Sequence, residues 1–237
     1  MTRSSVWIQQ EIFGVKLYIY RSNIQSATTI YFLDGEQFKE TFCNWIIEHK
    51  PALALNFVLI DSKNRADDYT PWPLQASNAM PKDFGGKAAE HLTFITTKVI
   101  PFCESEYGFS SSTEKRVIGG YSLGGLFSLY AAVNTDLFGT ILSCSSSMWY
   151  PDFLDYLMEH PFKALHPNLY MSVGDEEGLT ASNLTKDQIP NTMAFKDWLE
   201  KKFQANDFKF ILEEGNHGNN IPRRVERAVG WVKENSK

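Results

Sequence analysis

The sequence predicts an α/β protein, in which a mostly parallel sheet lies between two layers of helices as a three-layer sandwich. Short apolar runs rich in β-branched residues alternate along the chain with segments whose apolar residues recur at helical spacing. Strands that are separated by helices pair in parallel through right-handed crossovers. The chain has 237 residues, which is the length of one large domain, and we expect residues 1–237 to form it.

The first half of the chain opens with two strands. Residues 6–13 and 15–20 alternate in polarity on either side of Gly14, which predicts an antiparallel pair. Two later apolar runs predict strands buried on both faces, and apolar residues at helical spacing lie between them. In order, the further expected segments are strand 28–33, helix 38–46, strand 53–60, a long polar loop 61–83 and helix 88–102.

The second half continues the alternation of strands and helices. Apolar runs again predict the strands, and apolar residues three or four positions apart predict the helices. In order, the expected segments are strand 116–119, helix 124–134, strand 140–143, strand 169–173, helix 195–203, strand 208–212 and helix 223–234.

Composition and charge argue against several classes of partner. The net charge is −5, and the basic pairs Lys201-Lys202 and Arg223-Arg224 are too short for a nucleic-acid footprint, so we interpret them as solvated helix faces. No stretch reaches the ~18 apolar residues of a membrane-spanning helix. We therefore expect neither nucleic acid nor a membrane as a partner, and the sequence leaves the oligomeric state open.

The three cysteines, Cys43, Cys103 and Cys144, are an odd number without metal-ligand spacing. We interpret them as small buried side chains, which favours a reducing compartment. The N-terminus carries no apolar segment of the signal-peptide kind, so we expect a cytoplasmic protein. No metal-ligand cluster or phosphate-cradling glycine loop is apparent, and we expect no metal and no cofactor.

The strongest chemical signal is the Gly-Tyr-Ser-Leu-Gly run at residues 120–124, between a predicted strand and a predicted helix. At such a turn the serine sits in a strained backbone conformation that lifts its hydroxyl above the sheet. Side chains at positions 120 and 124 would collide with neighbouring backbone, which explains the two glycines. The N-terminal amides of the next helix favour developing negative charge. Ser122 is therefore the expected nucleophile.

A general base is expected after the last strand, because this architecture orders its groups as serine, acid and histidine. Three of the five histidines follow Ser122. His160 and His166 precede the strand at 169–173, where surface or packing roles are expected. His217 lies between the last predicted strand and the last helix, where its neutral imidazole can take the serine proton and later deliver it to the leaving alcohol.

The acid is expected just after strand 169–173, where the chain offers three carboxylates in a row, Asp175, Glu176 and Glu177. One of them must accept a hydrogen bond from the imidazole and stabilise the imidazolium. The spacing alone leaves all three open.

Two backbone N–H donors must lie about 3 Å from the developing oxyanion. One is expected from Leu123, the residue after the nucleophile. We assign the other to Glu36, in the loop after strand 28–33, with Gly35 as the alternative.

With these residues in hand, the chain resembles the esterase branch of the α/β-hydrolases. That branch includes enterobactin esterases, feruloyl and acetyl-xylan esterases, S-formylglutathione hydrolase and the mycolyltransferases. The resemblance spans nearly the whole chain. It is carried by YFLDGE at 31–36, R…YTP at 65–71, IGGYSLGGLF at 118–127, SSSMWY at 145–150 and GNH at 215–217.

The resemblance implies the α/β-hydrolase fold and a serine-dependent carboxylic ester hydrolase. It would act through an acyl-enzyme on a small or medium ester of siderophore, acetyl or aryl type. In many members the acid stands three residues after the glycine that ends its strand, which implies Glu177, with Asp175 as runner-up. The family pattern also agrees with Glu36 as oxyanion donor. Position 146 is serine where the family usually has proline, and the short chain predicts a compact, open cleft.

Two further residues are expected near the substrate. Trp149 follows strand 140–143 and would wall the acyl or leaving-group pocket. Arg65 would pair with a substrate carboxylate or phenolate, or with a nearby acid such as Asp67. Two rival functions stay open, namely an acyltransferase or thioesterase with the same triad, and a non-catalytic binding module on the same fold.

Overall fold

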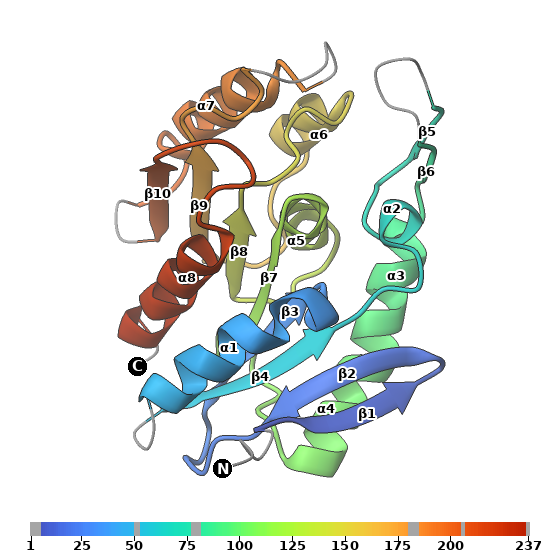
Figure 1. Cartoon of the computed structure of the whole chain (residues 1–237), viewed down its shortest axis with the longest axis vertical. Coiled ribbons are helices and arrows are strands. Elements are labelled where there is room, and N and C mark those ends of the chain that lie inside the picture. Colours follow the sequence, from blue (N-terminus) through green and yellow to red (C-terminus); the bar gives the residue numbers. More distant parts are fainter. Residues whose placement is uncertain (1–5, 50–52, 77–81, 180–184, 205–206, 236–237) are drawn as a thin grey trace.

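The computed structural model describes residues 6–49, 53–76, 82–179, 185–204 and 207–235. They form an eight-stranded sheet in the order β1-β2-β4-β3-β7-β8-β9-β10, together with a two-stranded hairpin of β5 and β6 (Figure 1). The strands are β1 (Ile8–Ile12), β2 (Val15–Tyr20), β3 (Thr28–Leu33), β4 (Leu55–Ile60), β5 (Pro73–Leu74), β6 (Phe84–Gly85), β7 (Arg116–Tyr121), β8 (Thr140–Cys144), β9 (Asn168–Gly174) and β10 (Phe208–Glu213).

Helices cover both faces of the sheet, so the molecule has three layers (Figure 1). Buried residues of α1 and α8 pack on one face, and buried residues of α3 to α7 pack on the other. The helices are α1 (Gly35–His49), α2 (Arg65–Asp68), α3 (Ala88–Phe94), α4 (Ile100–Tyr107), α5 (Leu123–Asn134), α6 (Phe153–Glu159), α7 (Gln188–Leu199) and α8 (Ile221–Asn235).

Strand pairing confirms the predicted fold class. β1 and β2 pair antiparallel, and β2 pairs antiparallel with β4. The pairs from β4 through β3, β7, β8 and β9 to β10 are all parallel. The result is the mostly parallel α/β-hydrolase sheet with an antiparallel N-terminal pair. Because the carboxyl ends of parallel strands share one edge of a sheet, the loops after β3, β7, β9 and β10 gather at that edge.

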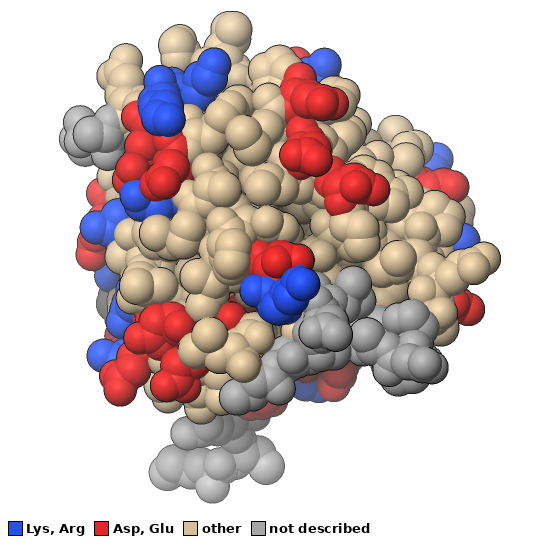
Figure 2. Space-filling view, turned by 90° about the horizontal axis from the view of Figure 1, so that it is seen from above, with Lys and Arg blue, Asp and Glu red and all other residues tan. Residues whose placement is uncertain are grey.

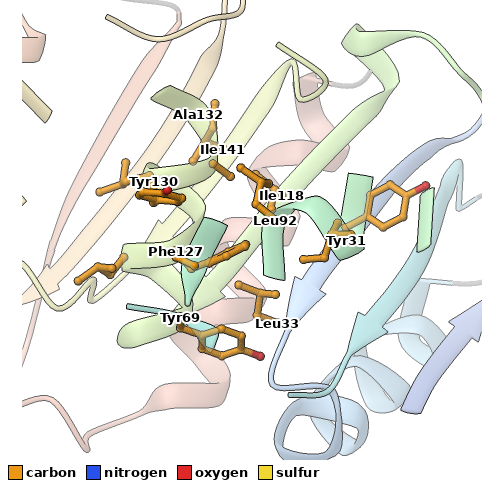
Figure 3. Close-up of a cluster of buried hydrophobic side chains, with 14 of the residues drawn as sticks. Tyr31, Leu33, Tyr69, Leu92, Ile118, Phe127, Tyr130, Ala132 and Ile141 are labelled. Carbon is orange, nitrogen blue, oxygen red and sulfur yellow. The ribbon is translucent and has the colours of Figure 1, made fainter. Parts of the chain in front are cut away.

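The central strands are buried on both faces because their alternate side chains enter two different cores. On β3, Tyr31 and Leu33 join the cluster beneath α5, whereas Ile30 and Phe32 join the cluster beneath α1 and α8. Figure 3 shows the first cluster, with Phe127 of α5 lying among residues from β3, β7 and neighbouring helices. This double burial explains why the strands appear in the sequence as continuous apolar runs.

The connections hold more regular structure than the sequence predicts. The expected loop 61–83 contains α2 and β5, and β6 follows directly after it, while residues 77–81 lie outside the described part. The expected helix 88–102 extends to Tyr107 and has a π-helical turn at Ile95–Val99. Pro101 has no N–H to donate one turn back, which favours the wider turn before it. Helix α6 was not predicted, since its seven residues bury only Phe153 and Leu157.

Cys103 and Cys144 are buried as expected, but Cys43 is only partly buried, which corrects the prediction for that residue. Cys43 lies on α1 beside Phe42, and it is Phe42 that points into the core. All three thiols are free. Within the described residues, no helix combines the length and the apolar character needed to cross a bilayer.

β7 and α5 approach each other so closely that certain positions admit no side chain. A Cβ atom at Gly120 would lie within 3 Å of the backbone of Gly124, and one at Gly125 would lie 2.5 Å from Ser146 Oγ. At Gly124 itself the nearest atom would be 3.4 Å away, which is ordinary contact. The contacts that exclude a side chain are therefore those at Gly120 and Gly125. The prediction that a side chain at position 124 would collide with neighbouring backbone is wrong.

Gly120→Ala is expected to lower the free energy of unfolding by about 3 kcal/mol or more, because a methyl group would be forced into backbone that cannot yield. Gly230→Ala is the matched control, since a Cβ there meets nothing within 4 Å and α8 would gain helix propensity. It should stabilise the protein by about 0.5–1 kcal/mol. Urea denaturation of both variants measures the difference, and equal effects would contradict the crowding argument.

Candidate active site

Ser122 occupies a sharp turn between the end of β7 and the start of α5. Its backbone has φ 61° and ψ −120°, outside the regions that L residues favour. Two backbone hydrogen bonds hold it there, from Ser122 N–H to Cys144 O at 3.0 Å and from Ser147 N–H to Ser122 O at 3.1 Å. The strained turn predicted for this serine is therefore present, and its hydroxyl lies at the carboxyl edge of the sheet.

The structure brings Ser122, His217 and Glu177 into one hydrogen-bonded chain. Ser122 Oγ lies 3.0 Å from His217 Nε2, and His217 Nδ1 lies 2.8 Å from Glu177 Oε2. The His217 side chain is 46% exposed, whereas the Glu177 side chain is fully buried. A hydroxyl, an imidazole and a carboxylate at these distances are the arrangement in which a base activates a nucleophile and an acid orients the base.

Tyr121 anchors the loop that carries His217. Its hydroxyl donates to the backbone carbonyl of His217 at 2.6 Å, and the two rings lie 5.2 Å apart. Burial raises the pKa of Tyr121 to about 12, so the phenol keeps its proton and remains a donor near neutral pH. The residue before the nucleophile therefore fixes the position of the base.

Of the three consecutive carboxylates, only Glu177 meets the imidazole. Its second oxygen, Oε1, accepts from the N–H of Gly174 at 2.7 Å. Burial raises the pKa of Glu177, but its hydrogen bond to His217 and the other donors around it outweigh burial and lower the pKa overall. Asp175 is exposed and instead accepts from the N–H of Gly215 at 2.8 Å, and Glu176 is exposed as well.

The two expected oxyanion donors differ in whether their N–H group already has an acceptor. Leu123 is the first residue of α5, so its N–H has no acceptor within the helix. The N–H of Glu36 donates to Asp61 Oδ1 at 2.6 Å, so this amide is already engaged. Gly35 and Glu36 lie in the first turn of α1 and not in the expected loop, and a Cβ on Gly35 would lie 3.0 Å from the backbone of Leu59, which explains the glycine at this position. Glu36 as oxyanion donor stays a prediction that requires Asp61 to release the amide.

Arg65 pairs with Asp34 and not with Asp67. Its Nε lies 2.9 and 2.8 Å from the two carboxylate oxygens of Asp34, and its Nη2 donates to Tyr121 O at 3.2 Å. The guanidinium therefore ties the loop after β3 to the end of β7. Burial raises the pKa of Asp34, and the Arg65 guanidinium opposes that effect. A contact of Arg65 with substrate stays a prediction.

Trp149 is partly exposed and packs against two other aromatic rings. Its ring lies 6.0 Å from Phe84 and 5.7 Å from Tyr150. Together with Tyr150 it lines a cavity of about 320 Å³ whose other lining residues include Asp152, Leu154 and Asn191. Neither Ser122 nor His217 lines this cavity, whose rim is acidic, and the role of Trp149 in an acyl or leaving-group pocket stays a prediction.

Three residues at the site were not found from the sequence. Ser147 Oγ lies 3.4 Å from Ser122 Oγ. Gln188 Nε2 donates to Ser146 O at 2.7 Å and lies 3.4 Å from Glu177 Oε2. Arg224, interpreted as part of a solvated pair, is 1% exposed and contacts Glu177, whereas Arg223 beside it is exposed as expected. Among the described residues, no three His, Cys, Asp or Glu side chains gather as a metal site would require.

The chain is similar in sequence and in fold to several known proteins. The chain is 30% identical over 177 residues to "Uncharacterized protein YbbA" of Bacillus subtilis (strain 168), covering 73% of this chain and 71% of that protein. It is 29% identical over 180 residues to the siderophore enterobactin esterase of Emericella nidulans, covering 65% and 59% respectively. The structure of siderophore hydrolase EstA from Aspergillus nidulans matches with a TM-score of 0.74 at 19% identity, covering 97% and 94%.

The sheet order, the strand–serine–helix turn and the structural neighbours define an α/β-hydrolase fold. Residues 13–207 also match the family model described as "Putative esterase". The chain belongs to this esterase family, so the predicted family and the predicted class of enzyme, an ester hydrolase, are confirmed.

Glu177→Gln is expected to lower kcat by roughly 10²–10⁴-fold, because an amide cannot stabilise the imidazolium and can present the wrong group to Nδ1. Asp175→Asn is the matched control, since its amide oxygen can still accept from Gly215 and it does not touch His217. Steady-state hydrolysis of a p-nitrophenyl ester by both variants measures the contrast. A larger loss in Asp175→Asn would move the acid to that residue.

Proposed function

We propose that the chain is a serine-dependent carboxylic ester hydrolase that works through an acyl-enzyme on Ser122. The observation that carries the proposal is the unbroken hydrogen-bonded chain from Ser122 through His217 to the buried Glu177. Membership of the esterase family supports the same chemistry. A hydrolase fold kept only for binding has no need of these three groups at these distances.

The proposed reaction has two halves. His217 Nε2 takes the proton of Ser122 as Oγ attacks the ester carbonyl, and the proton then passes to the departing alcohol as its C–O bond breaks. A water molecule, deprotonated by His217, attacks the acyl-enzyme and releases the carboxylic acid and Ser122. Glu177 keeps the imidazole in the productive tautomer and stabilises its charged form in both halves.

Backbone amides would stabilise the tetrahedral oxyanion. Leu123 offers a helix N-terminal N–H beside the nucleophile. Glu36 would supply the second donor by exchanging its Asp61 partner for the oxyanion. Arg65 holds the segments that carry these amides at a fixed separation, because it contacts Asp34 and Tyr121, which precede them.

The proposed substrate is a small or medium ester with an aryl or siderophore-type group. Trp149 is the partly exposed ring of an aromatic group, backed by the buried Phe84 and Tyr150, and it offers a surface on which a flat ring can pack. The relatives named as siderophore esterase and siderophore hydrolase support the same class. The acidic rim of the Trp149 cavity, with Asp152 and Asp155, disfavours a free carboxylate at that end of the substrate.

Hydrolysis is favoured over acyl transfer by the exposure of the base. Because 46% of the His217 side chain is accessible, water reaches the imidazole directly. An acyltransferase or thioesterase with the same triad would show itself in the products formed when an alcohol or thiol acceptor is added.

The surface charges and the cysteines bear on the partners and the compartment of the protein. Figure 2 shows acidic and basic side chains in small separate groups on one face, with uncharged surface between them, which supports a small-molecule substrate and not nucleic acid. The three free cysteines support a cytoplasmic location.

Ser122→Ala is expected to abolish turnover, with a loss of roughly 10⁴-fold or more, and to prevent covalent labelling by a fluorophosphonate probe. The probe reacts with an activated serine, so label and activity should disappear together. A series of p-nitrophenyl esters of increasing chain length then measures the depth of the acyl pocket. If the unmodified protein takes no label, the binding-module alternative replaces this proposal.

His217→Ala is expected to reduce kcat/KM by at least roughly 10³-fold, because His217 is the base that lies within hydrogen-bond distance of Ser122 Oγ in the described part of the chain. His166→Ala is the matched control, since His166 is exposed and makes no contact with Ser122, His217 or Glu177. Comparable losses in both histidine variants would show that the effect is not specific to the base.

A further inference from the structure

Arg224 is a buried cation at the start of the last helix. Only 1% of its surface is exposed, although it stands next to the exposed Arg223. A Cβ atom on Gly174 would lie 2.7 Å from Arg224 Nη2, so the glycine that ends β9 makes space for the guanidinium. A buried charge of this kind is retained only where paired groups surround it.

One nitrogen of the guanidinium faces the acid. Nη1 lies 2.8 Å from Glu177 Oε1, 3.1 Å from Ser145 Oγ and 3.3 Å from the Tyr121 hydroxyl. The two oxygens of the Glu177 carboxylate therefore have different partners, since Oε1 contacts Arg224 and Oε2 contacts His217. Rotation of the carboxylate away from the imidazole would break the contact with Arg224.

The other nitrogen faces the loop of the base. Nη2 donates to Glu214 O at 3.1 Å and to Asn216 O at 3.0 Å, the carbonyls just before His217. The phenol of Tyr121 that Nη1 contacts also donates to His217 O. A guanidinium is planar and rigid, so one group contacts both the acid and the base loop, in addition to the direct Asp175–Gly215 hydrogen bond, whereas a lysine ammonium could serve only one side.

We propose that Arg224 is a positioning residue for the reaction, which fixes Glu177 and the His217 loop relative to each other so that the imidazole meets Ser122. The inference rests on the proposed function and adds a residue to it. Arg224 touches neither the substrate nor the reacting atoms. It acts through Glu177 and through the backbone of residues 214–216.

The test uses kcat per active molecule, with active molecules counted by complete fluorophosphonate titration, so that misfolded protein does not enter the value. Arg224→Met is expected to lower kcat about 10²-fold while KM changes less than about threefold, because the triad and not the pocket is disturbed. Arg224→Lys should lose less, since it keeps a cation beside Glu177. Arg223→Met is the matched control and should keep the full kcat.

A double-mutant cycle separates positioning from a purely structural role. Because Arg224 acts in part through Glu177, adding Arg224→Met to Glu177→Gln should cost clearly less than the about 10²-fold that Arg224→Met costs in the unmodified protein. Losses that multiply would overturn the inference. The double variant also removes the uncompensated buried carboxylate, so it remains informative if Arg224→Met alone does not fold.

The possible outcomes separate this inference from the proposed function. If the unmodified protein hydrolyses esters and Arg224→Met keeps its kcat per titrated site, the inference alone fails, even if the melting temperature falls. If the unmodified protein takes no label and hydrolyses no ester, the proposed function fails and the inference falls with it.

Discussion

The turn at Ser122 is the constraint on which the rest of the site depends. A residue other than glycine at φ 61° and ψ −120° costs of order 1–3 kcal/mol and persists only where its surroundings hold it. Here the carbonyl of Cys144 and the amide of Ser147 clamp the serine from β8 and the loop after it, and the bare backbone at Gly120 lets α5 pack against β7. These contacts with the sheet thus offset the backbone strain at Ser122. The serine hydroxyl is held in a fixed position, toward which His217 is directed.

The ionisable side chains of the site extend from the solvent-exposed surface into the core. His217 is half exposed, Glu177 is fully buried, and Arg224 lies beyond it with 1% exposure. A carboxylate in that position would be costly to bury alone, and the surrounding donors lower its pKa in spite of burial. The site therefore places a permanent anion behind a base that water can reach.

Much of the fold could be predicted from the sequence, because strands buried on both faces leave continuous apolar runs. Ser122 could be proposed from a local motif, and His217 from its place after the last predicted strand and from the order of catalytic groups along the chain. The choice of Glu177 could not come from spacing, because the three adjacent carboxylates differ in how the turn after β9 buries them: Glu177 is buried, whereas Asp175 and Glu176 are exposed. The resemblance selected Glu177, and the contact with His217 agrees with that choice.

Arg224 and the Glu36 amide were beyond local reasoning for different reasons. A basic pair on a helix usually faces solvent, yet Arg224 stands four residues before the buried Ala228, and that helical spacing was the available signal. The engagement of the Glu36 amide depends on how closely the ends of β3 and β4 lie together. Leu33 pairs with Ile60, which brings the following residues, including Asp61, to the same edge.

The place of Arg224 in the chain has a consequence for biosynthesis. β7, Ser122 and α5 emerge from the ribosome long before α8, and domains of this size begin to fold as they are made. Until the segment through Arg224 has been synthesised and docked, Glu177 has no cation behind it and the His217 loop lacks the contacts that Arg224 adds to those of Tyr121. A chain that ends before α8 would thus hold Ser122, Glu177 and His217 without the group that contacts both the acid and the base loop.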